Sequence, residues 1–281
     1  RVQYSHAAIN QPHRWGMAGK WCDLFANAVH DGVDACFDVY PYDASSSALT
    51  QYLPAWVQAD GVDAMAERLS NPEIFARAEK DLANGWGALE IPWQWDRVML
   101  SATEGLLDTK PGERIDEAAL ERNVTPEHLV LELCRLGGNR VMVVLFYRTE
   151  EDMRTFIRSP YSMICSDGSA IAFKQTKALP HPRSYGAATR ALGFIGREKH
   201  DLPLEEIIYK MSGKVAAHMG IHDRGTLAVG KAADIVAFDP ETVSDKGTFT
   251  EPGQPPVGID YVIVNGKVAV VGGVQSEVRA G

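Results

Sequence analysis

The first 42 residues contain an apolar stretch, an amphipathic stretch and a second apolar stretch, and this order restricts the chain to few folds. The segment VQYSH (2–6) predicts a strand. In WCDLFANAVHDG (21–32) the apolar side chains recur every three or four positions until Gly32 ends the predicted helix. ACFDVYPY (35–42) predicts the next strand. A strand, a helix and a strand within about forty residues predict a βαβ unit, which needs a parallel sheet.

A similar order returns after residue 124. Thr125 and Pro126 open a helix as its N-cap and first residue. VMVVLF (141–146) is a continuous apolar run that is typical of a strand buried on both faces. A helix capped by Thr149 and the strand YSMICSDG (161–168) follow. We therefore expect an α/β fold, either a barrel or a doubly wound sheet.

The pattern differs over about residues 46–140. A helix capped by Asn71 is predicted there, followed by GWGALEIPWQWDRV (85–98), which crowds three of the six tryptophans among glycine and proline. This stretch is too long for an ordinary βα connection. We expect an insertion that either covers the site as a lid or substrate wall, or packs as a subdomain without substrate contact. The three tryptophans are Trp86, Trp93 and Trp95.

The last sixty residues change character again. DRGTLAVGKAADIVAFDP (223–240) and GIDYVIVNGKVAVVGG (258–273) predict short strands, and the Asn265–Gly266 pair favours a tight hairpin. We expect a small β domain over residues 221–281, after an α/β part over residues 1–220.

Composition limits the function. The formal net charge of −9 argues against a broad nucleic-acid surface, and no apolar run approaches the ~20 residues of a membrane span. The four cysteines lack paired metal spacing, so reduced core thiols are expected. We expect a cytoplasmic protein, although a sequence that begins with Arg1 says little about export. The cysteines are Cys22, Cys36, Cys134 and Cys165.

Chemically useful side chains follow the predicted strands. His6 follows the first, Tyr40 and Tyr42 the second, and Asp167 the last. Catalytic groups of a parallel α/β barrel lie at the carboxyl ends of its strands. A histidine and an aspartate there suit a metal-bound water and the carboxylate that moves its proton. Alternatively, His6 is a hydrogen-bonded structural residue, and Asp167 with Gly168 forms an ordinary Asp-Gly turn.

The segment HPRSYG adds His181, Arg183 and Tyr185, which lie 14 to 18 positions after Asp167. An arginine in this loop can bind a carboxylate through two parallel hydrogen bonds, or it can fix the loop to backbone carbonyls. The other histidines have no mutual ligand spacing.

Taken in order, these pieces resemble the N-acyl-D-amino-acid deacylase (D-aminoacylase) family of the metal-dependent amidohydrolase superfamily. The resemblance rests on SH, DVYPYDASS, LPAWV, WDRVMLS, SDGSA, HPRSYG, RGTLAVGKAADIVAFDP and VIVNGKVAV. It spans nearly the whole chain. It implies the C-terminal part of a TIM-like (β/α)8 barrel with a long insertion, followed by part of a small β-sandwich domain.

The resemblance also implies roles for the site residues. His6 would bind metal at the end of the sixth barrel strand, and Asp167 would be the general base and acid at the end of the eighth. One or two zinc ions are implied, and Arg183 would bind the substrate carboxylate. The remaining expected substrate contacts are Tyr40, Tyr42, His181 and Tyr185.

Two departures from the family affect the expected function. The family commonly has a lysine two residues after the metal histidine, where this chain has Ala8. The loss of one positive group favours a small amide, carbamate or acylated amine without a carboxylate. The family's first five strands, with its other metal ligands, have no counterpart here, so we expect a companion chain that carries them, because so few strands cannot close a barrel.

The sequence therefore predicts a zinc-dependent amidohydrolase that cleaves a linear C–N bond in a small molecule. The sequence leaves two alternatives open. One is a cyclic amidase that resembles hydantoinase or dihydroorotase, and the other is a scaffold subunit without catalysis.

Overall fold

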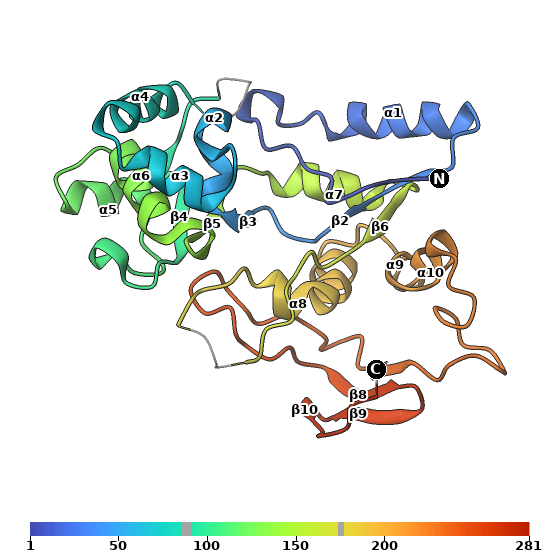
Figure 1. Cartoon of the computed structure of the whole chain (residues 1–281). Helices are drawn as coiled ribbons and strands as arrows, with labels where there is room; N and C mark the ends of the chain where they lie inside the picture. Colours follow the sequence, from blue (N-terminus) through green and yellow to red (C-terminus); the bar gives the residue numbers. More distant parts are fainter. Residues whose placement is uncertain (86–90, 174–176, 281) are drawn as a thin grey trace. The chain divides into compact units, whose positions relative to one another are not determined.

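The computed structural model of the chain describes residues 1–85, 91–173 and 177–280 (Figure 1). Trp86 lies outside these residues. The chain divides into two compact units. The first unit comprises residues 1–43, 148–174 and 182–281, and the second comprises residues 44–147 and 175–181. Among the described residues, no helix combines the length and the hydropathy that crossing a membrane requires.

The first unit contains a three-stranded parallel sheet, and the predicted site residues His6, Tyr40 and Asp167 follow its strands. Its order is β1-β2-β6, and both pairings are parallel. Helix α1 (Ala18–His30) connects β1 to β2, which confirms the predicted βαβ unit. The strands are β1 (Val2–Tyr4), β2 (Ala35–Val39) and β6 (Ser162–Ile164).

The helices of the first unit bury one apolar cluster against this sheet. Phe37 of β2 and Phe156 of α7 are almost fully buried, and the ring of Trp21 contacts each edge-on, at 5.0 and 5.1 Å between centroids. The Thr149 hydroxyl accepts a hydrogen bond from the Asp152 backbone, as its predicted role of N-cap requires. The other helices are η1 (Pro12–Arg14), α7 (Glu150–Arg158), α8 (Arg183–Arg190), the π-helix η7 (Ala191–Glu198), α9 (Leu204–Met211) and α10 (Gly213–Met219).

The last strands of the first unit form an antiparallel sheet of order β10-β9-β8-β7. Asn265 and Gly266 join β8 to β9 with φ angles of 49° and 74°, the left-handed values that a tight hairpin turn needs. The predicted hairpin is therefore confirmed. The strands are β7 (Ile235–Phe238), β8 (Ile259–Val264), β9 (Lys267–Val271) and β10 (Val274–Gln275).

The second unit contains a different, antiparallel sheet. Its order is β3-β5-β4, with β3 (Ser45–Ala48), β4 (Val98–Ala102) and β5 (Met142–Leu145). The apolar run that forms β5 is a buried strand, as predicted, but its assignment to a continued parallel βα pattern was wrong. A central strand covered on both faces has the same apolar sequence in a parallel and in an antiparallel sheet.

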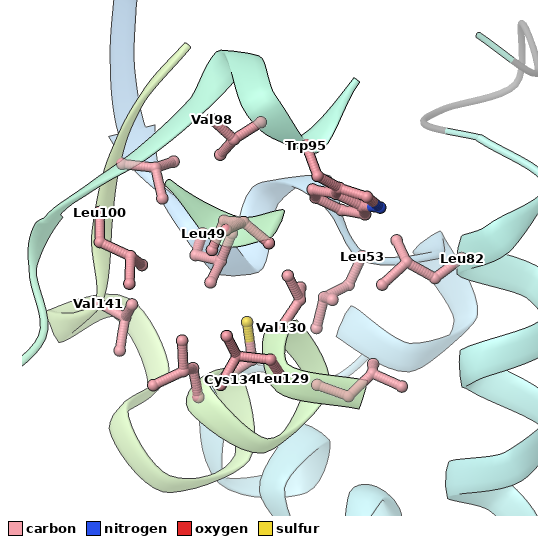
Figure 2. Packing of buried hydrophobic residues seen from close by; sticks show 14 of the residues in the cluster. Leu49, Leu53, Leu82, Trp95, Val98, Leu100, Leu129, Val130, Cys134 and Val141 are labelled. Atoms are coloured by element: carbon pink, nitrogen blue, oxygen red, sulfur yellow. The ribbon is translucent and has the colours of Figure 1, made fainter. Parts of the chain in front are cut away.

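Helices pack around this sheet, and the second unit has its own hydrophobic core (Figure 2). Leu82 and Cys134 are fully buried in it. Trp93 and Trp95 stack with 4.3 Å between ring centroids, so these two tryptophans pack within the unit. Asn71 and Thr125 cap their helices as predicted. The helices are η2 (Leu49–Tyr52), α2 (Ala55–Gln58), α3 (Val62–Leu69), α4 (Pro72–Ala83), η4 (Trp95–Arg97), η5 (Leu106–Asp108), α5 (Ile115–Glu121), α6 (Pro126–Gly137) and η6 (Gly138–Arg140).

Candidate functional site

The carboxyl ends of the three parallel strands carry the residues that the sequence singles out. His6 lies just after β1, Tyr40 directly after β2, and Asp167 just after β6. His6 and Asp167 both have left-handed φ angles, of 40° and 47°. Such angles are uncommon in residues other than glycine and often occur at functional sites. The backbone therefore turns sharply at both predicted reactive residues.

Tyr40 brings two arginines together. Its side chain is buried, and the guanidinium carbons of Arg183 and Arg148 lie 4.6 and 4.9 Å from its ring centroid. Both arginines thus make cation–π contacts with one ring. Nη1 of Arg148 also donates a hydrogen bond to the Tyr40 hydroxyl. Burial raises the pKa of Tyr40, so this hydroxyl keeps its proton at neutral pH.

Arg183 also holds Asp167. Its Nη1 lies 3.0 Å from Oδ2 of Asp167, and the arginine side chain is 10% exposed whereas that of the aspartate is 36% exposed. Gly168 lets the loop after β6 approach the start of α8, since a Cβ there would lie 2.7 Å from Cα of Ser184. The structure thus brings together the predicted general base and the predicted carboxylate-binding arginine.

His6 is exposed and fixed through its backbone. Its N–H donates to Oδ1 of Asp38 at 2.8 Å, and Asp38 also accepts a hydrogen bond from the side chain of Gln3. Within residues 1–85, 91–173 and 177–280, no three His, Cys, Asp or Glu side chains lie close enough to hold a metal ion. As a metal ligand, His6 would supply one donor to a set that the described part of the chain leaves incomplete.

Tyr42 lies in the same buried cluster as Tyr40 and has polar partners of its own. Its hydroxyl donates to Oδ2 of Asp245 at 3.3 Å, and the Arg190 guanidinium lies 4.8 Å from its ring centroid. Burial and the nearby Asp245 carboxylate raise the pKa of Tyr42. Tyr42 thus interacts with Asp245 and Arg190, while Arg148 and Arg183 contact Tyr40.

The other two predicted substrate contacts also have structural partners. Tyr185 is half-buried and stacks on Phe173, with 5.0 Å between centroids. His181 belongs to the second unit, where its buried Nε2 lies 3.1 Å from the carbonyl oxygen of Ala44. The roles of Tyr185 and His181 as substrate contacts stay predictions.

Arg148 is the residue of this group that the sequence did not indicate. It follows the apolar run of β5, and no short-range pattern relates it to Tyr40, 108 positions earlier. A basic residue between an apolar run and the Thr149 helix cap is the signal that could have drawn attention to it. Asp38 was missed for a similar reason, because it lies inside a predicted strand.

The chain matches a model of the amidohydrolase family over residues 173–270. It is 30% identical over 264 residues to an N-acyl-D-glutamate deacylase of Alcaligenes xylosoxydans xylosoxydans, covering 93% of this chain and 44% of the relative. A D-aminoacylase of the same organism is 36% identical over 176 residues, covering 61% of this chain and 34% of the relative.

Solved structures are similar as well. A D-aminoacylase crystal structure matches with a TM-score of 0.76 and 26% identity, covering all of this chain and 48% of that one. An N-acyl-D-glutamate deacylase from Bordetella bronchiseptica, complexed with zinc and a phosphonate mimic of the tetrahedral intermediate, matches with a TM-score of 0.70 and 26% identity, covering 95% and 46%.

The chain spans about half the length of these relatives. Since each of these matched proteins is a single chain about twice as long, the comparisons do not support the expected separate companion chain. The α/β architecture and the likeness in sequence and structure together confirm the resemblance found in the sequence. Over residues 173–270 the chain matches the amidohydrolase family, and over most of its length it is similar to N-acyl-D-amino-acid deacylases.

Proposed function

We propose that this chain forms part of a zinc-dependent amidohydrolase that hydrolyses a linear C–N bond, of an amide, N-acyl or carbamate type, in a small molecule. The observation that carries the proposal is the Asp167–Arg183 ion pair just after the carboxyl end of β6, a strand in the same parallel sheet as β1, which His6 follows. The relatives named above, which are deacylases of N-acyl amino acids, support a linear rather than a cyclic substrate.

We infer a finer architecture from the same relatives. The sheet β1-β2-β6 corresponds to the sixth, seventh and eighth strands of a (β/α)8 barrel, with the insertion over about residues 46–140 between the last two. The parallel order of these strands supports this assignment. The strands β7 to β10, within the domain proposed for residues 221–281, then form part of a small β-sandwich.

The proposed zinc site fits His6 as one donor. His6 would hold the zinc ion together with the further ligands, and the ion would supply Lewis-acid polarisation of the scissile carbonyl and a bound water of lowered pKa. His6 is exposed at the carboxyl end of β1, where barrel enzymes place their ligands. The proposal needs further ligands beyond those of the described residues, either from a longer polypeptide like the relatives or from a companion chain.

The residues of this chain have distinct tasks in the proposed reaction. Asp167 accepts the proton of the attacking water and then delivers it to the departing amine. The ion pair with Arg183 keeps the aspartate oriented before the substrate arrives. A substrate carboxylate that binds Arg183 would compete with Asp167 for the guanidinium, which releases an Asp167 oxygen for proton transfer.

The proposal is tested with Asp167→Asn in the enzyme that carries this chain. We expect kcat/KM for an N-acyl amino acid to fall at least ~100-fold while the zinc content is unchanged, because the variant retains the shape but loses the base. Asp108→Asn is the matched control, since Asp108 is also exposed and has a left-handed φ of 56°. Full activity in Asp167→Asn would remove the mechanism.

The same experiment separates the alternatives. If the chain is a scaffold subunit, the protein should contain no zinc, and kcat/KM should not depend on Asp167. A cyclic amidase would open hydantoin or dihydroorotate rings in preference to linear amides, and Asp167→Asn would abolish that activity instead. The substrate panel should therefore contain both linear and cyclic compounds.

A further inference from the structure

The chain between β7 and β8, residues 239–258, packs closely on η7 within the first unit. Arg197 of η7 donates hydrogen bonds from Nη1 to the carbonyl oxygens of Pro240 and Val243, at 3.1 and 2.7 Å. A Cβ at Gly193 of the same helix would lie 2.5 Å from the Val243 carbonyl oxygen, so a side chain there would displace the segment. Residues 239–258 are therefore held against this helix.

Asp245 extends from this segment to the turn that follows β2. Its Oδ2 accepts hydrogen bonds from the Tyr42 hydroxyl at 3.3 Å and from Nη1 of Arg190 at 3.4 Å. Gly186 of α8 permits this approach, because a Cβ there would lie 2.7 Å from Cβ of Asp245 and 3.0 Å from the Tyr42 hydroxyl oxygen. The Asp245 side chain is only 9% exposed, so water screens its contacts little.

Arg190 holds the backbone of the same turn. Its Nε donates to the carbonyl oxygen of Pro41 at 2.7 Å, and its guanidinium carbon lies 4.8 Å from the ring centroid of Tyr42. Within the turn, the N–H of Tyr42 donates to the carbonyl oxygen of Tyr40 at 2.9 Å. Arg190 and Asp245 thus fix the middle and the end of a turn that begins at Tyr40.

This turn carries the ring that Arg183 covers. Tyr40 is buried, and the Arg183 guanidinium carbon lies 4.6 Å from its ring centroid. Nη1 of Arg183 lies 3.0 Å from Oδ2 of Asp167. A shift of the turn would move the ring of Tyr40, and with it the guanidinium that orients the carboxylate. A continuous series of contacts therefore joins Asp245 and Arg190 to Asp167.

We propose that Asp245 and Arg190 are positioning residues for the reaction, which fix the turn after β2 and through it the orientation of Asp167. This inference rests on the proposed function. It gives residues 239–258, which lie between two strands of the antiparallel sheet, a role in catalysis without any contact to substrate. A misplacement of about 1 Å at a reacting group can cost ~100-fold in rate, so such distant contacts can affect turnover.

The test is a kinetic double-mutant cycle in the enzyme that carries this chain. Arg190→Met should lower kcat for an N-acyl amino acid by about 10- to 100-fold at a temperature well below its melting transition. In an Asp167→Asn background the same substitution should change kcat by less than about two-fold, because the group that it misplaces is already lost. Arg190→Lys should restore part of kcat, since it retains the charge and a hydrogen-bond donor.

Arg154→Met is the matched control. Arg154 and Asp201 form a similarly buried pair in the same unit, with side chains that are 19% and 4% exposed, against 24% and 9% for Arg190 and Asp245. The control variant should have a lower melting temperature and an unchanged kcat.

Three results would overturn the proposal. One is a wild-type kcat in Arg190→Met, and another is an equal loss of kcat in the Arg154→Met control. The third is the same fold-change from Arg190→Met in both backgrounds, because a purely structural role reduces the active fraction alike in the two.

The alkylation rate of Cys165 gives a reading without catalysis. Cys165 packs against the buried cluster that contains Tyr40 and Tyr42. Arg190→Met should raise the rate of its labelling by iodoacetamide severalfold and leave that of Cys22, in the other apolar cluster of the unit, unchanged. An unchanged Cys165 rate would show that the pair does not hold the turn. If the wild-type enzyme hydrolyses no linear amide, the proposed function fails, and the labelling rate alone decides whether Arg190 fixes the turn.

Discussion

Arg183 and Asp167 form an ion pair with 3.0 Å between Nη1 and Oδ2, and this pair joins the first residue of α8 to the loop after β6. The two residues are 16 positions apart in sequence. The arginine is nearly buried and also contacts the ring of Tyr40, whereas the aspartate is partly open to solvent. A ligand can therefore reach the carboxylate more easily than the guanidinium.

The first prediction concerns the stability of this pair. A double-mutant cycle with Arg183→Met and Asp167→Asn should give a coupling free energy of about 1 kcal/mol in urea unfolding, because a partly exposed pair is screened by water. The pair Arg197 and Glu198, which is 3.7 Å apart and more exposed, should give a coupling near zero. Equal coupling free energies in the two cycles would contradict the expectation that the less exposed Arg183–Asp167 pair is the stronger one.

The second prediction concerns the start of α4. The Asn71 side chain accepts hydrogen bonds from the backbone of Glu73 and Ile74, so Asn71→Ala should lower the free energy of unfolding by about 1 kcal/mol. Asn84 follows the same helix at its other end, is exposed and has no such side-chain bond to any residue that the structure describes. Asn84→Ala should change stability by much less in the same urea titration, and a similar loss in both variants would rule out the capping explanation.

Local features of the fold could be predicted because they depend on neighbouring residues. In the caps at Asn71, Thr125 and Thr149, a side-chain oxygen accepts a hydrogen bond from a backbone N–H two or three positions later in the sequence. The turn at Asn265 and Gly266 needs only two left-handed residues. Such signals are complete within a few positions of the sequence.

The pairing of β5 and the location of Arg148 could not be predicted in this way. The sequence of β5 specifies burial but not the direction of its neighbours. Arg148 contacts Tyr40 across 108 positions, and this contact depends on how α7 and β2 pack. His6 and Asp167 were indicated by their place after strands, but their roles stay predictions.

The third prediction concerns Lys210, whose ammonium is almost completely buried. It donates to the carbonyl of Ile157 and the hydroxyl of Ser162, both at 2.9 Å, and to the carbonyl of Ser159. Burial, with a smaller effect from the nearby Lys214, lowers the pKa of Lys210 to about 8 from an ordinary value of 10.5.

The sign of the pH effect follows from proton binding. Between pH 8 and 10.5 the unfolded chain holds more of this proton than the folded chain, so Lys210 should make the free energy of unfolding rise with pH. The rise is at most about 3 kcal/mol. Below pH 8 both states are protonated, and the contribution is flat.

Urea titrations at several pH values measure this effect as the difference between wild type and Lys210→Met. The variant should lack the rise, whereas Lys80→Met, which removes an exposed lysine of α4, should retain it. A wild-type curve that runs parallel to that of Lys210→Met from pH 8 to 10.5 would contradict the lowered pKa.

The last prediction concerns the four cysteines, all of which have free thiols in the structure. Cys134 is fully buried in the core of the second unit, and burial raises its pKa (Figure 2). Burial and the Asp38 carboxylate likewise raise the pKa of Cys165. Because the thiolate is the reactive form, both should react slowly with an alkylating reagent.

Mass spectrometry of peptides from iodoacetamide-treated protein measures each rate separately. In native protein at pH 8 we expect Cys134 to remain unlabelled while Cys36, which is only partly buried, is labelled first. In 6 M guanidinium all four thiols should react at similar rates, since unfolding removes the burial that separates them. Labelling of Cys134 at the rate of Cys36 in native protein would show that the core of the second unit opens far more readily than its packing implies, because a buried thiol reacts only when its surroundings open.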